Sequence, residues 1–269
     1  AARAWSEAGR NDASAPLLRE ACRLASDPTV LADAEHLLGR IEFVEGRAED
    51  ATALLSRAAD RVAGDPSRAA RILADAVDPW LVSGHTRRAE ETARRAWEVS
   101  RDEGGSSEIW AALRYGDVLG WQGEVERAEE LWRQAAAVPH PDDPQSLCAR
   151  GEALFSAGDD EAAAKVLGKA VAATRTTGSP GHLPYALHSL ALVETRRGRL
   201  RNALGAADEA EDRRAAHLHL PAGRGDPVAR SGICTARSPA DGDEIALGDD
   251  EIDVHGQVGE CGAPSLRLL

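Results

Sequence analysis

Residues that could carry out catalysis or hold a metal ion are scattered through the chain without the spacing that such chemistry needs. A phosphate-binding loop requires an upstream glycine and a hydroxyl residue after its lysine, and Gly168-Lys169-Ala170 has neither. The histidines and cysteines nearest the C-terminus match no zinc-ligand spacing; they are His217, His219, Cys234, His255 and Cys261. We therefore expect no catalytic residue, no cofactor and no metal ion, and a chain that is not an enzyme.

Aromatic and charged residues do recur on one side of the helices predicted below. Such a mixture suits a groove that holds a peptide or the face of a sugar. The candidate groove contacts are Asp33, His36, Arg40, Phe43, Arg71, Asp78, Trp110, Asp117, Trp121, Tyr185 and His188. An alternative is that Trp110 and Trp121 fill gaps between helices, which is the commoner role of large aromatic residues.

The elements that position these residues follow from a repeat. Glycines recur at intervals of 35 to 40 residues, at Gly9, Gly46, Gly84, Gly123, Gly158 and Gly198. Glycine leaves a helix at the lowest steric cost, so each is predicted to form the corner of a helical hairpin. Seven residues before the corner, three repeats carry a second glycine at a predicted close helix contact: Gly39, Gly116 and Gly151.

Alanines follow the corner glycines at fixed offsets, which places small side chains on one face of the second helix. Twelve residues after the glycine the alanines are Ala21, Ala58, Ala96, Ala135, Ala170 and Ala210. Five residues after it they are Ala51, Ala89, Ala128, Ala163 and Ala203, with Ser14 as the exception. Larger apolar residues at the ninth position should fill the space between hairpins: Leu18, Leu55, Trp132 and Leu167. Since one hairpin cannot bury its own apolar face, the hairpins must stack.

The repeat predicts an all-α array of about five and a half hairpins over residues 1–213. Asp-Pro pairs should begin three of its helices, at Asp27, Asp65 and Asp143, because an aspartate cap followed by proline is a typical helix start. Pro79 is expected to kink or shorten its helix. Residues 214–269 lack the period and are rich in Gly, Pro and Asp, so we expect an irregular or disordered tail, which a frameshift could have produced.

Charge and composition limit the classes of partner that the chain is expected to bind. The net charge is −13, and only Lys165 and Lys169 are lysines among 32 basic residues. An acidic chain does not favour direct nucleic-acid binding, and no apolar run is long enough to cross a membrane. Unpaired cysteines without regular spacing suggest a cytoplasmic protein. Arginine clusters beside acids are expected to form solvated faces with pairs four residues apart; they are Arg87, Arg88, Arg94 and Arg95, and Arg196, Arg197, Arg199 and Arg201.

The small residue late in the first helix, the corner glycine and the following alanines resemble the tetratricopeptide repeat (TPR). This resemblance implies a right-handed superhelical solenoid whose first helices line a concave face. The Lys and Asn pair with which some TPR domains hold a terminal carboxylate is absent from the matching positions, which disfavours binding of a chaperone C-terminus.

Three segments, residues 36–51, 54–59 and 65–73, further resemble the central region of large ATP-dependent LuxR-type transcriptional regulators of actinobacteria. The resemblance implies a sensor segment that binds a protein partner or a small inducer in its concave groove, without the ATPase and helix-turn-helix parts. The alternative is a stand-alone TPR adaptor for protein–protein interaction.

Overall fold

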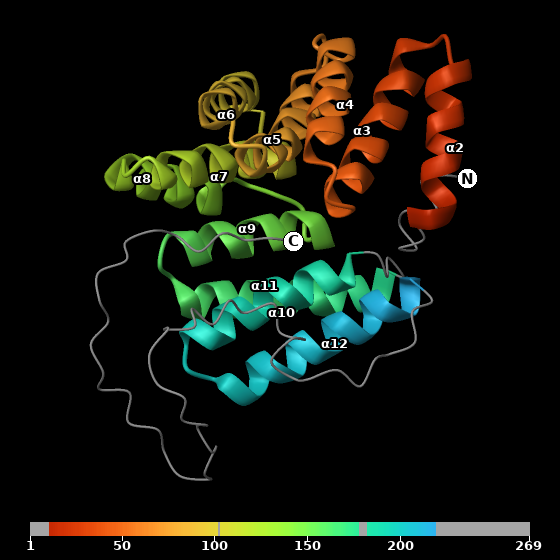
Figure 1. Cartoon of the computed structure of the whole chain (residues 1–269). Helices are drawn as coiled ribbons and strands as arrows, with labels where there is room; N and C mark the ends of the chain where they lie inside the picture. Colours follow the sequence, from red (N-terminus) through yellow and green to blue (C-terminus); the bar gives the residue numbers. More distant parts are fainter. Residues whose placement is uncertain (1–10, 102, 178–181, 219–269) are drawn as a thin grey trace, which may run out of the picture.

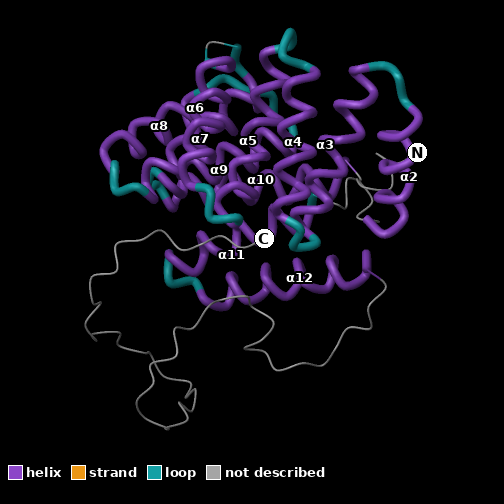
Figure 2. The backbone as a smooth tube through the Cα atoms, turned by 45° about the horizontal axis from the view of Figure 1, so that its top comes forward, coloured by secondary structure: helices purple, strands orange, loops and turns teal. Residues whose placement is uncertain are grey.

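The computed structural model describes residues 11–101, 103–177 and 182–218, and within them every regular element is a helix. The helices follow one another along a curved array (Figures 1 and 2). They are α2 (Asn11–Leu24), α3 (Pro28–Val44), α4 (Ala48–Arg61), α5 (Pro66–Val82), α6 (Thr86–Ser100), α7 (Gly105–Trp121), α8 (Val125–Ala137), α9 (Pro144–Ser156), α10 (Asp160–Thr177), α11 (Leu183–Arg196) and α12 (Leu200–Leu218). The expected all-α solenoid of TPR-like hairpins is confirmed.

Five hairpins turn at the glycines that the repeat indicates: α3–α4, α5–α6, α7–α8, α9–α10 and α11–α12. The corner glycines have φ between 72° and 85°, a conformation that other residues adopt only with strain; they are Gly46, Gly84, Gly123, Gly158 and Gly198. At the first of these corners Gly46 N–H donates to the Phe43 carbonyl and Arg47 N–H to the Glu42 carbonyl, which satisfies the end of α3. Gly9 lies outside the described residues.

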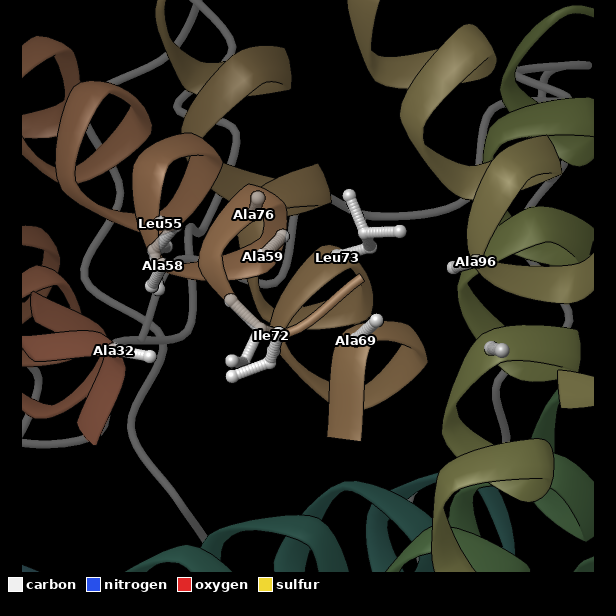
Figure 3. Close-up of a cluster of buried hydrophobic side chains, with 11 residues drawn as sticks. Ala32, Leu55, Ala58, Ala59, Ala69, Ile72, Leu73, Ala76 and Ala96 are labelled. Atoms are coloured by element: carbon white, nitrogen blue, oxygen red, sulfur yellow. The ribbon is translucent and has the colours of Figure 1, made fainter. Parts of the chain in front are cut away.

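The alanine positions form the seams of the array. The second helix of every hairpin buries its alanines five and twelve residues after the corner, and Ser14 at the exceptional position is also fully buried. Figure 3 shows one seam, where Leu55 and Ala58 of α4 gather with Ile72 and Ala76 of α5. In the first repeat Ala21 is only half-buried.

The second set of glycines has a tighter role than the sequence indicates. A Cβ atom added to Gly39 would lie 2.8 Å from Leu55 Cγ, and one added to Gly151 would lie 2.5 Å from Leu167 Cγ. At Gly116 the nearest atom would be Trp132 Nε1, at 2.6 Å. The large residue at the ninth position therefore also packs within its own hairpin, directly against the glycine of the first helix, which has no side chain.

The helix starts at the Asp-Pro pairs are confirmed. Asp27 accepts a hydrogen bond from Thr29 N–H (2.7 Å), Asp65 from Arg68 N–H (3.1 Å), and Asp143 from two backbone N–H groups (3.0 Å each), with proline in the first turn of each helix. Pro79 does not shorten α5, which continues to Val82. The proline lies in the last turn, where a missing N–H removes one hydrogen bond only.

The last helix extends beyond the expected end of the array. Helix α12 continues to Leu218, five residues past the boundary that loss of the period indicates. The tail, its possible frameshift, and the cysteines and histidines beyond Leu218 lie outside the described residues.

Candidate functional site

The first helices of the hairpins form one continuous layer. Helix α3 packs on α5, α5 on α7, α7 on α9 and α9 on α11, whereas second helices of the described hairpins show no comparable packing on one another. The more closely packed layer of a curved stack lies on its inner side. The first helices therefore line the concave face, as the resemblance implies.

Within this layer, one position recurs thirteen residues before each corner glycine. We call this set the inner column; its members are Asp33, Arg71, Trp110, Gln145 and Tyr185. Four of them are candidate groove contacts predicted from the sequence; Gln145 is not among those candidates, although it has the same offset. The Arg71 guanidinium lies 4.8 Å from the Trp110 ring centroid, and the rings of Trp110 and Tyr185 are 6.2 Å apart.

One carboxylate joins three basic side chains of α3 and α5. Asp75 lies 2.8 Å from His36 Nε2, 3.4 Å from Arg71 Nε and 3.8 Å from Arg40 Nε. Burial alone would raise the pKa of Asp75, but Arg71, the His36 hydrogen bond and Arg40 together lower it well below its usual range. Burial lowers the pKa of His36, and the charges of Arg40 and Arg71 lower it further. Asp75 acts to raise this pKa, but the net shift is downward.

This arrangement makes the stability pH-dependent. Because the pKa of His36 is lower in the folded chain, the unfolded chain takes up that proton first as the pH falls. The free energy of unfolding should decrease from pH 7 to pH 5, with a share from His36 limited to about 1.4 kcal/mol per pH unit. Stabilisation by Asp75 should persist until the pH falls below its ordinary pKa.

Urea unfolding at both pH values checks this expectation. His36→Gln should remove the His36 share of the slope, so its stability should decrease less steeply from pH 7 to pH 5 than that of wild type. Equal slopes in wild type and His36→Gln would contradict the assignment.

A second charged group lies on α7. Arg114 is 12% exposed; it lies 3.4 Å from Asp78 Oδ2 and 3.0 Å from Asp117 Oδ2, and its guanidinium is 5.2 Å from the Trp110 ring centroid. Asp117 also accepts a hydrogen bond from Trp132 Nε1 at 3.1 Å. The first helices of neighbouring hairpins are thus held together by polar as well as apolar contacts.

Three polar contacts between first helices recur at the same offsets, which were not predicted from the sequence. A residue six before one corner contacts a residue nine before the next; the pairs are Arg40 with Asp75, Asp78 with Arg114, and Glu152 with Ser189. The partners are 35 to 37 residues apart, close to the repeat length. Polar residues at these two offsets in consecutive repeats were the signal that could have revealed them.

The remaining candidate groove residues lie at separate places along the layer of first helices. Asp33 pairs with Arg68 at the start of the layer, and His188 lies half-buried on α11, one turn after Tyr185. Phe43 is half-buried near the end of α3. Trp121 is 43% exposed at the end of α7, on the same face as Trp110 because residues eleven apart align on a helix.

The two candidate tryptophans of α7 therefore differ. Trp110 is 5% exposed, belongs to an apolar cluster, and has an indole N–H that is buried without an acceptor. Packing between hairpins is a fitting description of Trp110. It does not describe Trp121, whose side chain is partly exposed.

Two hollows lie on the outer side of the array, where no site is predicted from the sequence. One of about 590 Å³ lies between α4 and α6 over Trp80, and one of about 450 Å³ lies beside Trp97 at the ends of α6 and α8. Arg88 stacks on Trp80 at 5.0 Å. The lining of each hollow comes from more than one hairpin, so a single repeat does not specify it.

The two arginine clusters pair only in part as expected. Arg94 pairs with Glu98 four residues away, as expected. Arg95 instead reaches Asp60 of α4, and Arg196 reaches Asp160 of α10. A carboxylate about one repeat earlier in the sequence lies on the neighbouring helix, within reach of each of these arginines. Their ion pairs therefore link two helices instead of lying along the solvent-exposed face of one helix.

No group of three or more potential metal ligands occurs among the residues that the structure describes. Cys22 and Cys148 are free, and burial raises the pKa of both thiols. Among the described helices, none is both long and apolar enough to cross a membrane.

Comparison with known proteins relates the chain to helical-repeat structures by fold alone. No family model and no curated protein matches it. BtubC (BKLC) from P. vanneervenii is 19% identical, covers 91% of this chain and 99% of its own, and has a TM-score of 0.45. A thermophilic TPR protein of Thermus thermophilus, TTC0263, is 22% identical over 70% of this chain and 100% of its own, with a TM-score of 0.48. A Rap protein complexed with Competence and Sporulation Factor is 16% identical over 77% of this chain and 59% of its own, also at 0.48.

Proposed function

We propose that the chain is a non-catalytic interaction module whose concave face binds an extended peptide segment of a protein partner. The observation that carries the proposal is the gathering of charged and aromatic side chains from several hairpins on the first-helix layer. Arg71 and Arg114 are both largely buried there against Trp110. Burial of charge with shifted pKa values is typical of functional sites.

The face offers an extended ligand two kinds of contact. Trp121 and Arg40 are exposed at the end of α7 and on α3, so they can supply apolar area and a hydrogen-bonding cation. Between them lie the carboxylates Asp78 and Asp117, which can accept hydrogen bonds from a peptide backbone. A small inducer is a second candidate ligand, since the guanidinium groups of Arg71 and Arg114 lie 4.8 and 5.2 Å from the Trp110 ring centroid and so form a compact group.

A selection with random peptides of about twelve residues, displayed on phage, tests the proposal. Peptides enriched on the full chain should bind with affinities that Trp121→Ala and Arg40→Ala each weaken about tenfold. Fluorescence anisotropy with the labelled peptides measures the effect. Arg94→Ala is the matched control, because Arg94 is an exposed arginine on the outer side of α6.

The outcomes separate the possibilities. Peptides weakened by Arg94→Ala but not by Trp121→Ala would place binding on the outer side. A selection without enrichment would contradict binding of an extended peptide. Circular dichroism should show unchanged helix content in all three variants, because each substituted side chain is at least two-fifths exposed.

We infer that the chain is a sensor segment of a LuxR-type ATP-dependent regulator. The support for this inference is the resemblance of the three sequence segments given above. In that role the segment itself would not contact nucleic acid. The stand-alone adaptor is the alternative. The coding sequence around the segment distinguishes them: a Walker-type phosphate loop upstream and a helix-turn-helix downstream support the regulator, and their absence supports the adaptor.

A further inference from the structure

Two contacts on the concave face join hairpins that are not neighbours. With its amide oriented so that oxygen faces the guanidinium, Gln145 of α9 accepts hydrogen bonds from both Nη atoms of Arg71 of α5, at 3.1 and 3.0 Å. The ring of Trp110 of α7 meets that of Tyr185 of α11 at 6.2 Å, tilted by 50°. Each contact skips one hairpin of the array.

A stacked array does not need such contacts, since each repeat normally touches only its immediate neighbours. Neither helix pair, α5 with α9 or α7 with α11, packs closely along its backbone. The link across the concave face therefore depends on side chains alone. Side-chain contacts of this kind can open while the hairpins themselves stay folded.

Trp110, which takes part in one of these contacts, carries a buried group that lacks a partner. Trp110 Nε1–H is buried and has no acceptor, while Arg71 and Arg114 both lie against the Trp110 ring. A buried donor without an acceptor is unfavourable. Opening the contacts would free this donor to meet water or a ligand oxygen.

We propose that Gln145–Arg71 and Tyr185–Trp110 form a latch that holds the array in a closed curvature and covers the middle of the concave face. The latch rests on the proposed function, because it regulates access to that same surface. A segment that carries acceptor oxygens opens it by replacing Gln145 on Arg71 and by satisfying Trp110 Nε1–H. Binding and curvature are thereby coupled.

Substitutions at Gln145 test the latch in both directions. Gln145→Ala removes the acceptor and should open the latch, while Gln145→Glu places a carboxylate opposite Arg71 and should tighten it. The measurement is hydrogen exchange of the tryptophan indole N–H groups in the full-length chain, followed by NMR, with the Trp110 signal assigned through Trp110→Phe. Gln145→Ala should speed exchange at Trp110 about tenfold, and Gln145→Glu should slow it.

The control is Ser67→Ala, which removes a 3.1 Å hydrogen bond to Ser107 between neighbouring hairpins and should leave exchange at Trp110 unchanged. Small-angle X-ray scattering should give a larger radius of gyration for Gln145→Ala than for Gln145→Glu. Equal exchange at Trp110 in both Gln145 variants would overturn the latch.

The two proposals fail separately. If exchange responds to Gln145 but the phage-selected peptides do not bind the concave face, the latch stands as a device of the fold and the binding proposal falls. If those peptides bind wild type, Gln145→Ala and Gln145→Glu with equal affinity, the binding proposal stands and the latch is contradicted.

Discussion

Replacing Gly151 by valine should lower the free energy of unfolding by about 3 kcal/mol, because overpacking a filled seam forces side chains and backbone apart. A Cβ at this position already lies 2.5 Å from Leu167 Cγ and 2.7 Å from Leu167 Cδ2. Leu167 is fully buried within the hairpin and against α11, so it has no free direction in which to move. Urea unfolding followed by circular dichroism measures the loss.

Gly168 provides the matched control for this prediction. It lies in α10 beside Leu167, and a Cβ added there meets nothing within 4 Å. Gly168→Val should change stability by less than about 0.5 kcal/mol, because helix propensity favours valine slightly over glycine. Similar destabilisation by both substitutions would show that glycine at position 151 is not a packing requirement.

Arg114→Met should cost about 2–4 kcal/mol, since it leaves Asp78 and Asp117 without their shared cation in a poorly hydrated place. Methionine keeps much of the apolar contact with Trp110, so the loss reports the charge more than the packing. Replacing Asp78 by asparagine in the same chain should recover part of the loss, because one uncompensated carboxylate is then gone.

Arg94→Met is the control for the charge. Arg94 is about half exposed and pairs with Glu98 within one helix, so Arg94→Met should destabilise the chain much less than Arg114→Met. If Arg114→Met destabilises no more than Arg94→Met in urea unfolding, then the concave ion pairs contribute little to the stacking of α5 on α7.

The corners and seams of the fold could be predicted because each depends on a local requirement. A corner at Gly84 needs positive φ, and the seam at Ala96 needs a small side chain; both are properties of one position in one repeat. Recurrence then makes a weak local signal strong. The helix start at Asp143 is predictable for the same reason, since its cap bonds are made within three residues.

The polar contacts of the concave face could be predicted only in part. Placing each first helix by its corner glycine finds Arg71, Trp110 and Tyr185, yet which of them touch depends on the stagger and curvature between helices. The contact of Arg71 with Gln145 skips one hairpin, so no pattern within one repeat indicates it. Arg95 was expected to pair within its own helix and pairs instead with Asp60 of α4, for the same reason.

The tryptophan indole signals test most directly whether the partner segment binds the concave face. Trp110 and Trp121 lie on that face of α7, whereas Trp80 and Trp97 border the two outer hollows. In an NMR titration of the full chain with a phage-selected peptide, the indole N–H signals of Trp110 and Trp121 should shift, and those of Trp80 and Trp97 should stay in place. Shifts confined to Trp80 and Trp97 would contradict concave binding.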